Sequence, residues 1–185
     1  MSFNIIIPTL GKPTLRNTLS SLECQLSDND RVTLVGDGPQ PDADKVALEF
    51  GVDYLECPVS RDAGFIRNYT MPLIKEDYLL FMDDDDIYLP GALDTIRKKI
   101  QQNPGRPLVF KMVLPDRHII WRTPRVKFGN VSTQMIVVPN IPEKLGKWGK
   151  IRGTDFAFLQ STEKLYPPNS IVWCDEIICF CRPDQ

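Results

Sequence analysis

Short apolar runs alternate with amphipathic helical patterns along the first 102 residues. Four runs rich in β-branched and aromatic side chains predict buried strands at residues 3–7, 32–35, 52–55 and 78–82. Between them, a leucine stripe predicts a helix that Pro13 opens, Gly51 ends a second helix, and Pro72 ends a third. Strands and helices in strict alternation with short connections predict a parallel sheet, as in one half of a Rossmann-like α/β fold.

Beyond residue 102 the strand patterns follow one another without helices between most of them. We expect strands at residues 108–114, 119–123, 135–138, 171–174 and 177–181. A helix from about residue 155 to 165 should begin at Thr154 or Asp155 as its cap. The glycine-rich stretch from Gly146 to Lys150 predicts a mobile loop. No linker divides the sequence, so we expect one α/β domain over residues 1–185, with halves at 1–102 and 103–185.

Composition places the chain among globular proteins. Its 185 residues are 42% hydrophobic and 25% charged, which is ordinary for one domain with a sizeable core. No apolar stretch approaches the roughly 20 residues of a membrane span, and the N-terminus lacks a signal-peptide pattern. The five cysteines are odd in number and lack CxxC spacing, which favours reduced thiols in the core over disulfides or a zinc site. We therefore expect a cytoplasmic protein.

Charge is distributed unevenly along the sequence. The formal net charge is only −2, but residues 111–152 carry nine Lys or Arg against Asp116 and Glu143. This basic segment suits an anionic ligand or a lipid surface, although ordinary solvated loops would have the same composition. We therefore consider peripheral membrane contact, and we expect no nucleic-acid partner.

The strongest chemical signal is the stretch from Tyr78 to Pro90. The predicted strand at 78–82 runs directly into four consecutive aspartates at positions 83–86, and a helical apolar stripe follows. In open α/β sheets, ligands bind where strands end in this way. Mg²⁺ or Mn²⁺ would relieve the repulsion among the carboxylates and keep coordination sites for substrate phosphates. The alternative is a solvated acidic loop that caps the next helix.

Four strand-end sequences together resemble a known family. They read IIIPTLGKPTLRNTLSSL, LVGDGP, RDAGFIRN and YLLFMDDDDIYLPGAL. In order and spacing, over roughly residues 3 to 100, they resemble the nucleotide-binding half of glycosyltransferase family 2, and the later GTDFAFLQ is similar to the acidic helix start of that family. The resemblance implies the GT-A fold, with a Rossmann-like, mostly parallel sheet and a mixed acceptor-side part. It also implies metal-dependent, inverting transfer of a sugar from a nucleoside-diphosphate sugar to a glycan, lipid-linked or other hydroxyl acceptor.

The resemblance assigns nucleotide contacts to the first three strand ends. Pro8 and Thr9 would line the base and ribose, and Asp37 would accept a hydrogen bond from the base. Gly36 stands where the family often has a further aspartate, so one usual contact is missing. Arg67 would reach the base or the diphosphate, because its planar fork suits phosphate oxygens. The structural alternatives are a turn residue for Asp37 and a solvated helical side chain for Arg67.

The family's DxD pattern is best matched by Asp83 and Asp85. Asp83 would bind the ribose side and share a Mn²⁺ or Mg²⁺ ion with Asp85, which would connect that ion to the diphosphate. Asp84 would contact the sugar or ribose, and Asp86 would support its neighbours. Because all four residues are identical, the register is uncertain by one position.

An inverting transfer also requires a base for the acceptor hydroxyl. The resemblance points to Asp155, with Asp175 and Glu176 as the next candidates. The structural alternative for Asp155 is a helix cap. His118, the only histidine, lies in a strand-like stretch and is interpreted as structural.

Two other functions remain open on the sequence. A nucleotidyltransferase uses a similar sheet and Mg²⁺, but its glycine-rich loop is absent after the first strand. A protein could also retain the nucleotide site without transferase activity. Because 185 residues leave little room for an acceptor domain, we expect that further domains or a partner could supply the acceptor site.

Overall fold

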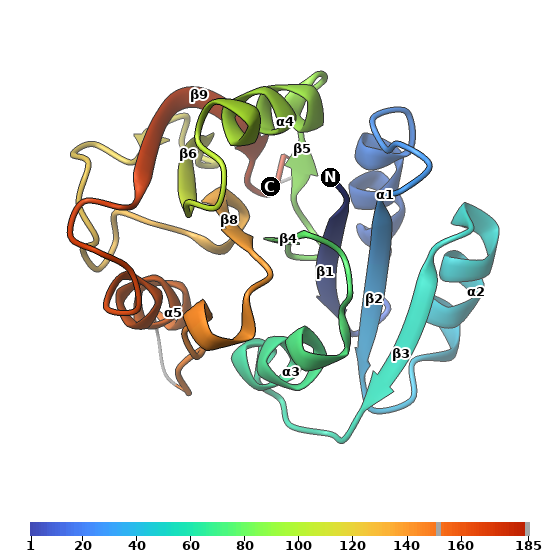
Figure 1. Cartoon of the computed structure of the whole chain (residues 1–185). Helices are drawn as coiled ribbons and strands as arrows, with labels where there is room; N and C mark the ends of the chain where they lie inside the picture. The colour runs from blue at the N-terminus through green and yellow to red at the C-terminus, as the bar shows by residue number, and fades with distance from the viewer. Residues whose placement is uncertain (151–152, 184–185) are drawn as a thin grey trace.

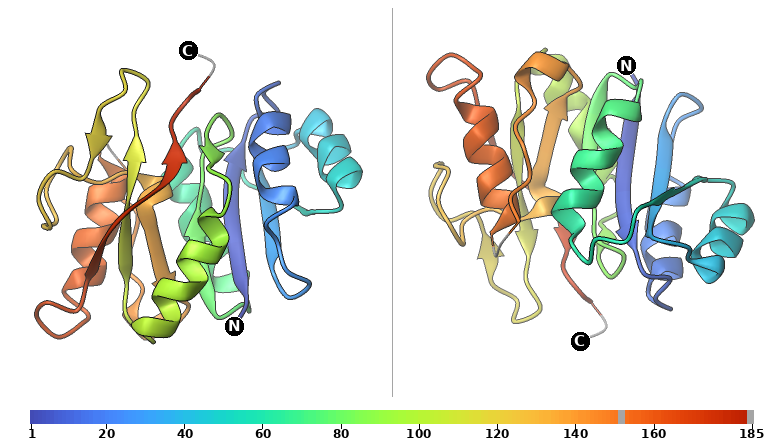
Figure 2. Two further views of the ribbon diagram at one scale, coloured as in Figure 1. Left: turned by 90° about the horizontal axis from the view of Figure 1, so that it is seen from above. Right: turned by 90° about the horizontal axis from the view of Figure 1, so that it is seen from below.

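The computed structural model describes residues 1–150 and 153–183. Within them, nine strands form one mixed sheet. Helices α1 (Leu15–Glu23), α2 (Pro41–Phe50) and α4 (Ala92–Gln102) cover one face of this sheet. Helices α3 (Ala63–Thr70) and α5 (Thr154–Glu163) cover the other face (Figures 1 and 2). The chain is therefore a three-layer α/β structure.

The first half forms the predicted parallel sheet. Strands β1 (Phe3–Thr9), β2 (Arg31–Asp37), β3 (Asp53–Cys57) and β4 (Tyr78–Phe81) lie in the order β3-β2-β1-β4, all parallel. A 3₁₀ turn, η1 (Met71–Leu73), follows α3 at the proline that was expected to end it. Because the strands are parallel, their carboxyl ends lie along one edge of the sheet, and this edge carries the site.

The second half extends the same sheet with antiparallel pairs. Strand β8 (Ile136–Pro139) pairs antiparallel with β4, and β6 (Leu108–Val113) pairs antiparallel with β8 and parallel with β9 (Val172–Phe180). Two short strands, β5 (Ile87–Tyr88) and β7 (Ile119–Ile120), lie beside β9 and β6, and two 3₁₀ turns, η2 (Thr133–Met135) and η3 (Pro142–Lys144), flank β8. The two last predicted strands are one irregular strand, β9, and the two-residue β5 was not predicted.

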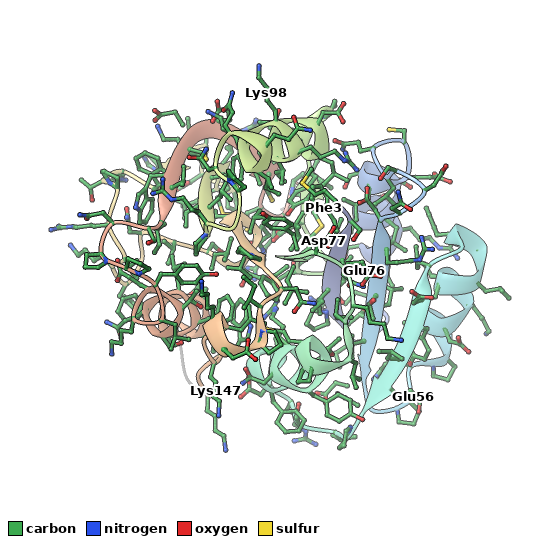
Figure 3. All side chains as sticks on the ribbon, viewed as in Figure 1. Phe3, Glu56, Glu76, Asp77, Lys98 and Lys147 are labelled. Carbon is green, nitrogen blue, oxygen red and sulfur yellow. The ribbon has the colours of Figure 1, made fainter. Side chains whose placement is uncertain are left out.

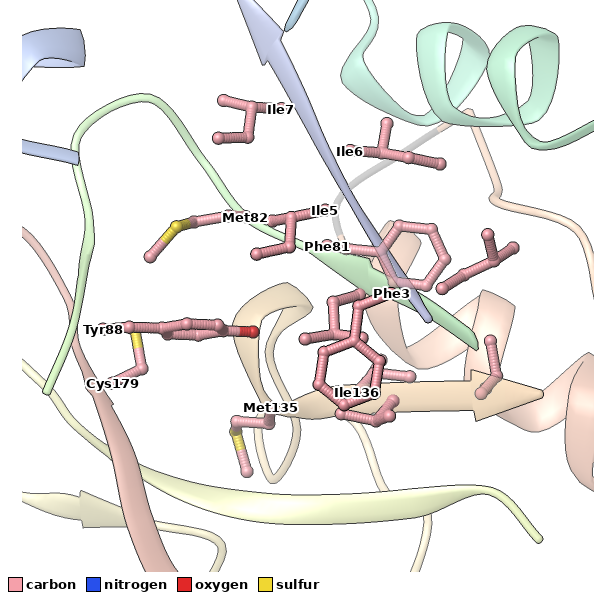
Figure 4. Close-up of a cluster of buried hydrophobic side chains, with 14 of the residues drawn as sticks. Phe3, Ile5, Ile6, Ile7, Phe81, Met82, Tyr88, Met135, Ile136 and Cys179 are labelled. Atoms are coloured by element: carbon pink, nitrogen blue, oxygen red, sulfur yellow. The ribbon is translucent and has the colours of Figure 1, made fainter. Parts of the chain in front are cut away.

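The core lies on both sides of the two central strands, β1 and β4. Phe3, Ile5 and Phe81 are fully buried, and they pack with Tyr88 and with Met135 of the second half (Figure 4). Both strands are buried on both faces, which is why their sequences are continuous apolar runs rather than alternating patterns.

The start of α5 differs from the prediction. Its N-cap is Gly153, which has φ +82°, and not Thr154 or Asp155; the Asp155 carboxylate accepts the N–H of the next residue, Phe156. A Cβ at Gly153 would meet the Phe128 ring at 2.5 Å, so the position requires glycine for space as well as for its positive φ. The predicted side-chain cap at Thr154 or Asp155 is therefore wrong.

The stretch from Gly146 to Lys150 is packed rather than mobile. The Trp148 side chain is 3% exposed and stacks on Phe158 with ring centroids 4.5 Å apart. The backbone N–H of Trp148 donates to Asn68 Oδ1, and the Asn68 amide donates to the Trp148 carbonyl, both at 2.9 Å. The stretch is a loop, as predicted, but its glycines permit close packing against α3 and α5, which the prediction of a mobile loop did not include. Residues 151 and 152, at its end, lie outside the described residues.

Two further sequence expectations concern cysteines and membrane segments. All five cysteines are free, and three are buried, whereas Cys24 is exposed and Cys181 is half-buried. Burial is the largest cause that raises the pKa of Cys174 and of Cys181 to about 12, and the negative charge of Asp86 adds to it at Cys181. Across residues 1–150 and 153–183, no helix combines the length and the apolar character that crossing a bilayer would require.

Candidate functional site

The carboxyl ends of β1, β2 and β4 meet around one cavity. Thr9 lies opposite Gly36 in the register of β1 and β2, and Ile6 lies opposite Phe81, so the residues that follow each strand project from the same edge. The cavity has a volume of about 700 Å³, which is the size of a site for a small organic molecule. The residues that line it come from these strand ends, the start of α3 and the C-terminal segment: Pro8, Thr9, Leu10, Lys12, Asp37, Val59, Arg61, Asp62, Ala63, Ile66, Asp83, Asp84, Asp85 and Arg182.

Asp37 holds the wall of this cavity in place. Its carboxylate accepts hydrogen bonds from the backbone N–H of Ser60 at 2.6 Å and of Arg61 at 2.7 Å. Next to it, a Cβ at Gly36 would meet the Tyr54 hydroxyl at 2.5 Å, which explains why a second aspartate does not precede Asp37 here. Asp37 therefore lines the cavity and also orders the loop before α3.

The four consecutive aspartates avoid mutual repulsion by taking different partners. Asp83 pairs with the buried guanidinium of Arg67, and its other oxygen accepts from Gln134 Nε2 at 3.0 Å. Arg67 is 2% exposed, and its guanidinium carbon lies 4.7 Å from the centre of the Trp148 ring. The solvated alternative for Arg67 is therefore wrong, because this side chain fixes the orientation of Asp83 from behind.

Asp84 and Asp85 share a lysine at the cavity. Lys12 Nζ lies 3.0 Å from Asp84 Oδ1 and 3.2 Å from Asp85 Oδ2. Asp84 also accepts from the Thr9 hydroxyl at 2.8 Å, and Arg182 Nε lies 3.5 Å from Asp85. Asp84 is thus held against the first strand, whereas Asp85 faces two partly exposed cations that could turn to a bound anion.

Asp86 lies behind the cavity, in the protein interior. It is 1% exposed and accepts hydrogen bonds from Gln134 Nε2 and from the backbone N–H of Arg182, the latter at 2.8 Å. Burial, together with the charge of Asp83, raises the pKa of Asp86 to about 7. Because a protonated Asp86 is neutral, its raised pKa lowers the negative charge of the cluster.

This raised pKa predicts a dependence of stability on pH. Between about pH 4 and the folded value of about 7, native Asp86 keeps a proton that the unfolded chain has lost. The free energy of unfolding should therefore fall as pH rises through that window, by an amount on the order of a few kcal/mol for this group. Asp86→Asn, which stays neutral, should flatten that part of the profile in urea unfolding, whereas the exposed control Asp94→Asn should retain it. Equal slopes for wild type and Asp86→Asn would mean that Asp86 is ionised in the folded protein.

Asp155 lies beside the cluster but does not line the cavity. Its carboxylate accepts the backbone N–H of Phe156 at 2.7 Å. Burial is the largest cause that raises the pKa of Asp155, the negative charge of Asp83 adds to it, and the positive charge of Arg67 opposes it. The residue is therefore close enough to Asp83 and Arg67 for their charges to be felt. A raised pKa suits a base that must accept a proton near neutral pH.

The other candidates for a base are bound elsewhere. Asp175 pairs with Lys111 at 2.7 Å, and Glu176 pairs with Lys99 at 2.8 Å. Neither lines the cavity. His118 bonds to Asp116 at 2.9 Å on an exposed turn, which agrees with a structural role.

The residues at the cavity fit a hard divalent cation with a phosphate ligand. Among the described residues, no group of three or more His, Cys, Asp or Glu side chains is gathered closely enough to hold a metal ion. Mg²⁺ and Mn²⁺ sites in nucleotide enzymes, however, commonly use one or two carboxylates and complete their shell with water and phosphate oxygens. Asp83 and Asp85 both line the cavity and offer such oxygens. The donor set therefore fits a cation that binds together with a diphosphate.

The structure gathers most of the residues that the sequence singled out. Six of the seven residues predicted to bind nucleotide, sugar or metal line the cavity, and the seventh, Arg67, lies directly behind Asp83. Sequence reasoning missed Lys12, Gln134 and Arg182. Lys12 follows the first strand and could have been found from its position, but Gln134 and Arg182 reach the site only through the pairing of β8 and β9 with distant strands.

Sequence comparison identifies relatives over most of the chain. A sequence model of the family described as Glycosyl transferase family 2 matches residues 4–162. A Haemophilus influenzae protein named as an uncharacterized glycosyltransferase is 28% identical over 145 residues, which is 74% of this chain and 48% of that protein. The chain thus spans about half the length of this relative.

Structure comparison finds the same fold in larger proteins. The crystal structure of S. aureus TarS residues 1–349 matches 98% of this chain and 60% of its own, with a TM-score of 0.76 and 18% sequence identity. Glucosyl-3-phosphoglycerate synthase from Mycobacterium tuberculosis, in complex with Mn²⁺, uridine diphosphate and glucosyl-3-phosphoglycerate, matches 98% of this chain and 72% of its own, with a TM-score of 0.74 and 14% identity. At these identities the likeness concerns the fold.

Proposed function

Because the chain belongs to glycosyl transferase family 2, we propose that it transfers a sugar from a nucleoside-diphosphate sugar to an acceptor hydroxyl, with inversion and with the help of a divalent cation. The chain has the GT-A fold that the sequence resemblance implied, and it is a glycosyltransferase domain. The donor, the cation, the stereochemistry and the acceptor are the parts of this function that we propose.

One observation carries the proposal: the carboxylates of Asp83 and Asp85 lie in one cavity with Pro8, Thr9 and Asp37. A nucleoside would occupy the part of the cavity near the first two strands, with its diphosphate beside the aspartates. Strand ends of a parallel sheet are where nucleotides bind in this class of fold.

We propose uridine diphosphate as the nucleotide of the donor. The proposal is supported by TarS, which was crystallised with UDP-GlcNAc and with UDP, and by the mycobacterial synthase, which was crystallised with UDP and Mn²⁺ or Mg²⁺. Asp37 would accept a hydrogen bond from the base. Its oxygens also accept from Ser60 and Arg61, so its orientation is fixed before the base arrives.

The residues around the diphosphate would have different roles in the reaction. A cation bound by Asp83 and Asp85 would neutralise negative charge as the diphosphate leaves. Lys12 and Arg182 stand beside Asp85 and can donate to phosphate oxygens. Arg67 holds Asp83 in one orientation. Preorganised charges of this kind stabilise a transition state without reorganising during the reaction.

Asp155 is the proposed base. In an inverting transfer the acceptor oxygen bonds to the anomeric carbon as the bond from that carbon to the diphosphate oxygen breaks. The acceptor proton then passes to the Asp155 carboxylate, for which a pKa raised by burial is suited. Asp155 lies in the second half of the chain, which we propose as the acceptor side, with residues 1–102 as the nucleotide side.

Three further parts of the proposal concern acceptor, partners and location. The acceptor is a glycan, a lipid-linked sugar or another hydroxyl compound. Because the chain spans 48% of its Haemophilus relative and 60% of the TarS chain, further domains or a partner are proposed to complete the acceptor site. The free thiols of all five cysteines support a reducing compartment such as the cytoplasm.

A donor-hydrolysis assay tests the function without knowledge of the acceptor. Purified protein is incubated with a panel of UDP-, GDP- and dTDP-sugars, with Mn²⁺, with Mg²⁺ or with chelator, and released nucleoside diphosphate is measured. We expect slow release from one UDP-sugar with metal and none with chelator. Tight binding of a nucleotide sugar without release of diphosphate, with or without acceptor mixtures, would instead favour a binding protein.

A further inference from the structure

An apolar stripe runs along the outer side of α3 and continues into η1. Phe65 is 37% exposed, Tyr69 is 42% exposed and Leu73 is 54% exposed, and their spacing of four residues places them on one side of the helix. The rings of Phe65 and Tyr69 stack with centroids 6.4 Å apart. Three large apolar side chains in one line on the surface differ from the scattered exposure that is normal for a folded protein.

Cationic side chains flank this stripe. The segment that carries Lys147 and Lys150 lies against α3, because Asn68 bonds to both the N–H and the carbonyl of Trp148. A Cβ on Gly64 would approach the Gly149 carbonyl oxygen to 2.6 Å, which confirms how closely the two segments approach. Figure 2, right, shows α3 and this part of the chain on the same face, and Figure 3 shows Lys147 projecting away from the ribbon.

Two more cations lie at the ends of the stripe. Arg61 precedes α3 and Lys75 follows η1, and both side chains are exposed. Over residues 1–150 and 153–183, none of these four cationic side chains forms an ion pair: Arg61, Lys75, Lys147 and Lys150. They are therefore free to bind anionic groups from outside the chain.

Most carboxylates near the stripe have other partners or lie to one side, whereas Asp53 and Glu76 line a hollow with Leu73 and Lys75 at its far end. Asp62 accepts the backbone N–H groups of Gly64 and Phe65 as the cap of α3. Glu76 accepts from Asn4 Nδ2 at 3.0 Å. Glu56 lies across α3 from Lys147 (Figure 3). The face formed by α3, η1 and residues 147–150, which we call the α3 face, is thus apolar in its centre and cationic at its rim.

We propose that the α3 face binds the surface of a membrane that contains anionic lipids. Aromatic and aliphatic side chains enter the boundary between headgroups and acyl chains, while lysines at the rim contact the anionic phosphates. The charge pattern favours this occupant over a protein partner, because four cations without ion pairs surround an apolar centre. A second copy of this chain would bring the same positive rims together, which is unfavourable.

Binding of the α3 face to a membrane would also fix where the donor cavity lies relative to the lipid surface. Arg61 and Ala63 belong to the lining of the donor cavity and to the start of the α3 face. Docking would therefore hold the rim of the cavity at the lipid surface. If the proposed transferase function holds, membrane docking favours a lipid-linked acceptor, whose hydroxyl is presented at that surface. Membrane binding itself does not depend on transferase activity.

Co-sedimentation with vesicles tests the proposal. The wild type should bind vesicles of phosphatidylcholine with phosphatidylglycerol, and it should bind vesicles of phosphatidylcholine alone at least about tenfold more weakly. The double variant Lys147→Glu/Lys150→Glu should lose about tenfold or more of the anionic binding. Its matched control, Lys45→Glu/Lys98→Glu, changes the same charge on α2 and α4, on the opposite face of the sheet, and should bind as the wild type does.

A second pair of variants tests the apolar stripe. Phe65→Ser/Tyr69→Ser should lose most vesicle binding, whereas Leu48→Ser, at a position 84% exposed on α2, should not. Nucleotide binding by each variant is measured in parallel and should match the wild type. This control shows that each variant is folded and has an intact donor site. Equal binding to neutral and anionic vesicles, or equal loss in the Lys45/Lys98 control, would overturn the proposal. A wild-type dimer in light scattering that Phe65→Ser/Tyr69→Ser converts to monomer would assign the face to a second copy instead.

Discussion

Asp155→Asn should reduce turnover of the donor in the presence of acceptor by a factor of roughly 10² to 10⁴ and leave nucleotide binding near wild type. A base acts on the acceptor hydroxyl in the transition state, so its loss does not weaken donor binding. Asparagine keeps the size of the side chain and can accept the Phe156 N–H that Asp155 accepts at 2.7 Å. The measurements are release of nucleoside diphosphate and calorimetric titration with the nucleotide.

The competing explanation for Asp155 is a structural role at the start of α5. Gly153 and not Asp155 is the N-cap of α5, but the Asp155 carboxylate accepts the N–H of Phe156 in the first turn. Asp155→Ala should therefore also lose about 1 kcal/mol of stability, a loss that Asp155→Asn avoids. Wild-type turnover should rise with pH through the raised pKa of Asp155, since only the ionised carboxylate accepts a proton, and that rise should vanish in Asp155→Asn. If Asp155→Asn turns over donor at the wild-type rate while Asp175→Asn is slow, the base has been wrongly assigned.

Asp85→Asn should remove most of the effect of Mn²⁺ on nucleoside diphosphate binding, with a loss of affinity of about 100-fold or more when metal is present. In chelator, the variant and the wild type should bind nucleotide equally weakly. Folding should change little, because the partners of Asp85 are half-exposed: Lys12 is 46% and Arg182 is 50% exposed. Ion pairs with such exposed cations are weak, and although the Asp85 side chain itself is 12% exposed, we expect a loss of only about 1 kcal/mol of stability.

A matched acidic substitution isolates this effect. Asp94→Asn removes a carboxylate that is 87% exposed on α4, away from the cavity, and should bind nucleotide and Mn²⁺ as the wild type does. Retained metal-dependent affinity in Asp85→Asn, together with its loss in Asp84→Asn, would shift the metal site by one position along the four aspartates. The metal-binding aspartate would then be Asp84 and not Asp85.

The parallel half of the fold could be predicted because its information is local. Three of its four strands, β1, β2 and β4, contain apolar runs, and each helix shows its own periodicity between two strands. The two-residue β5 could not be predicted, since Ile87 and Tyr88 form a strand only through pairing with Phe180 and Cys179. The residues 171–181 were expected as two strands because the polar pair Asp175 and Glu176 interrupts the apolar pattern of β9.

The candidate site also contains residues that the local sequence predicts and residues that it does not. Thr9, Asp37 and the aspartates follow parallel strands directly, so their convergence follows from the strand order. The partners that separate the four aspartates come from distant segments, Gln134 before β8 and Arg182 after β9, and no local pattern marks them. The glycines around Trp148 were interpreted as a sign of mobility, whereas they permit close packing against α3 and α5.

The most direct test of the central claim is calorimetric titration of the wild-type protein with UDP, in Mn²⁺ and in chelator. Metal-dependent glycosyl transfer at the cavity predicts saturable one-site binding in Mn²⁺, at least about tenfold weaker binding in chelator, and competition by one UDP-sugar. Equal affinity in Mn²⁺ and in chelator would contradict the account, because the charges of Lys12 and Arg182 would then suffice for the diphosphate and Asp85 would hold no metal.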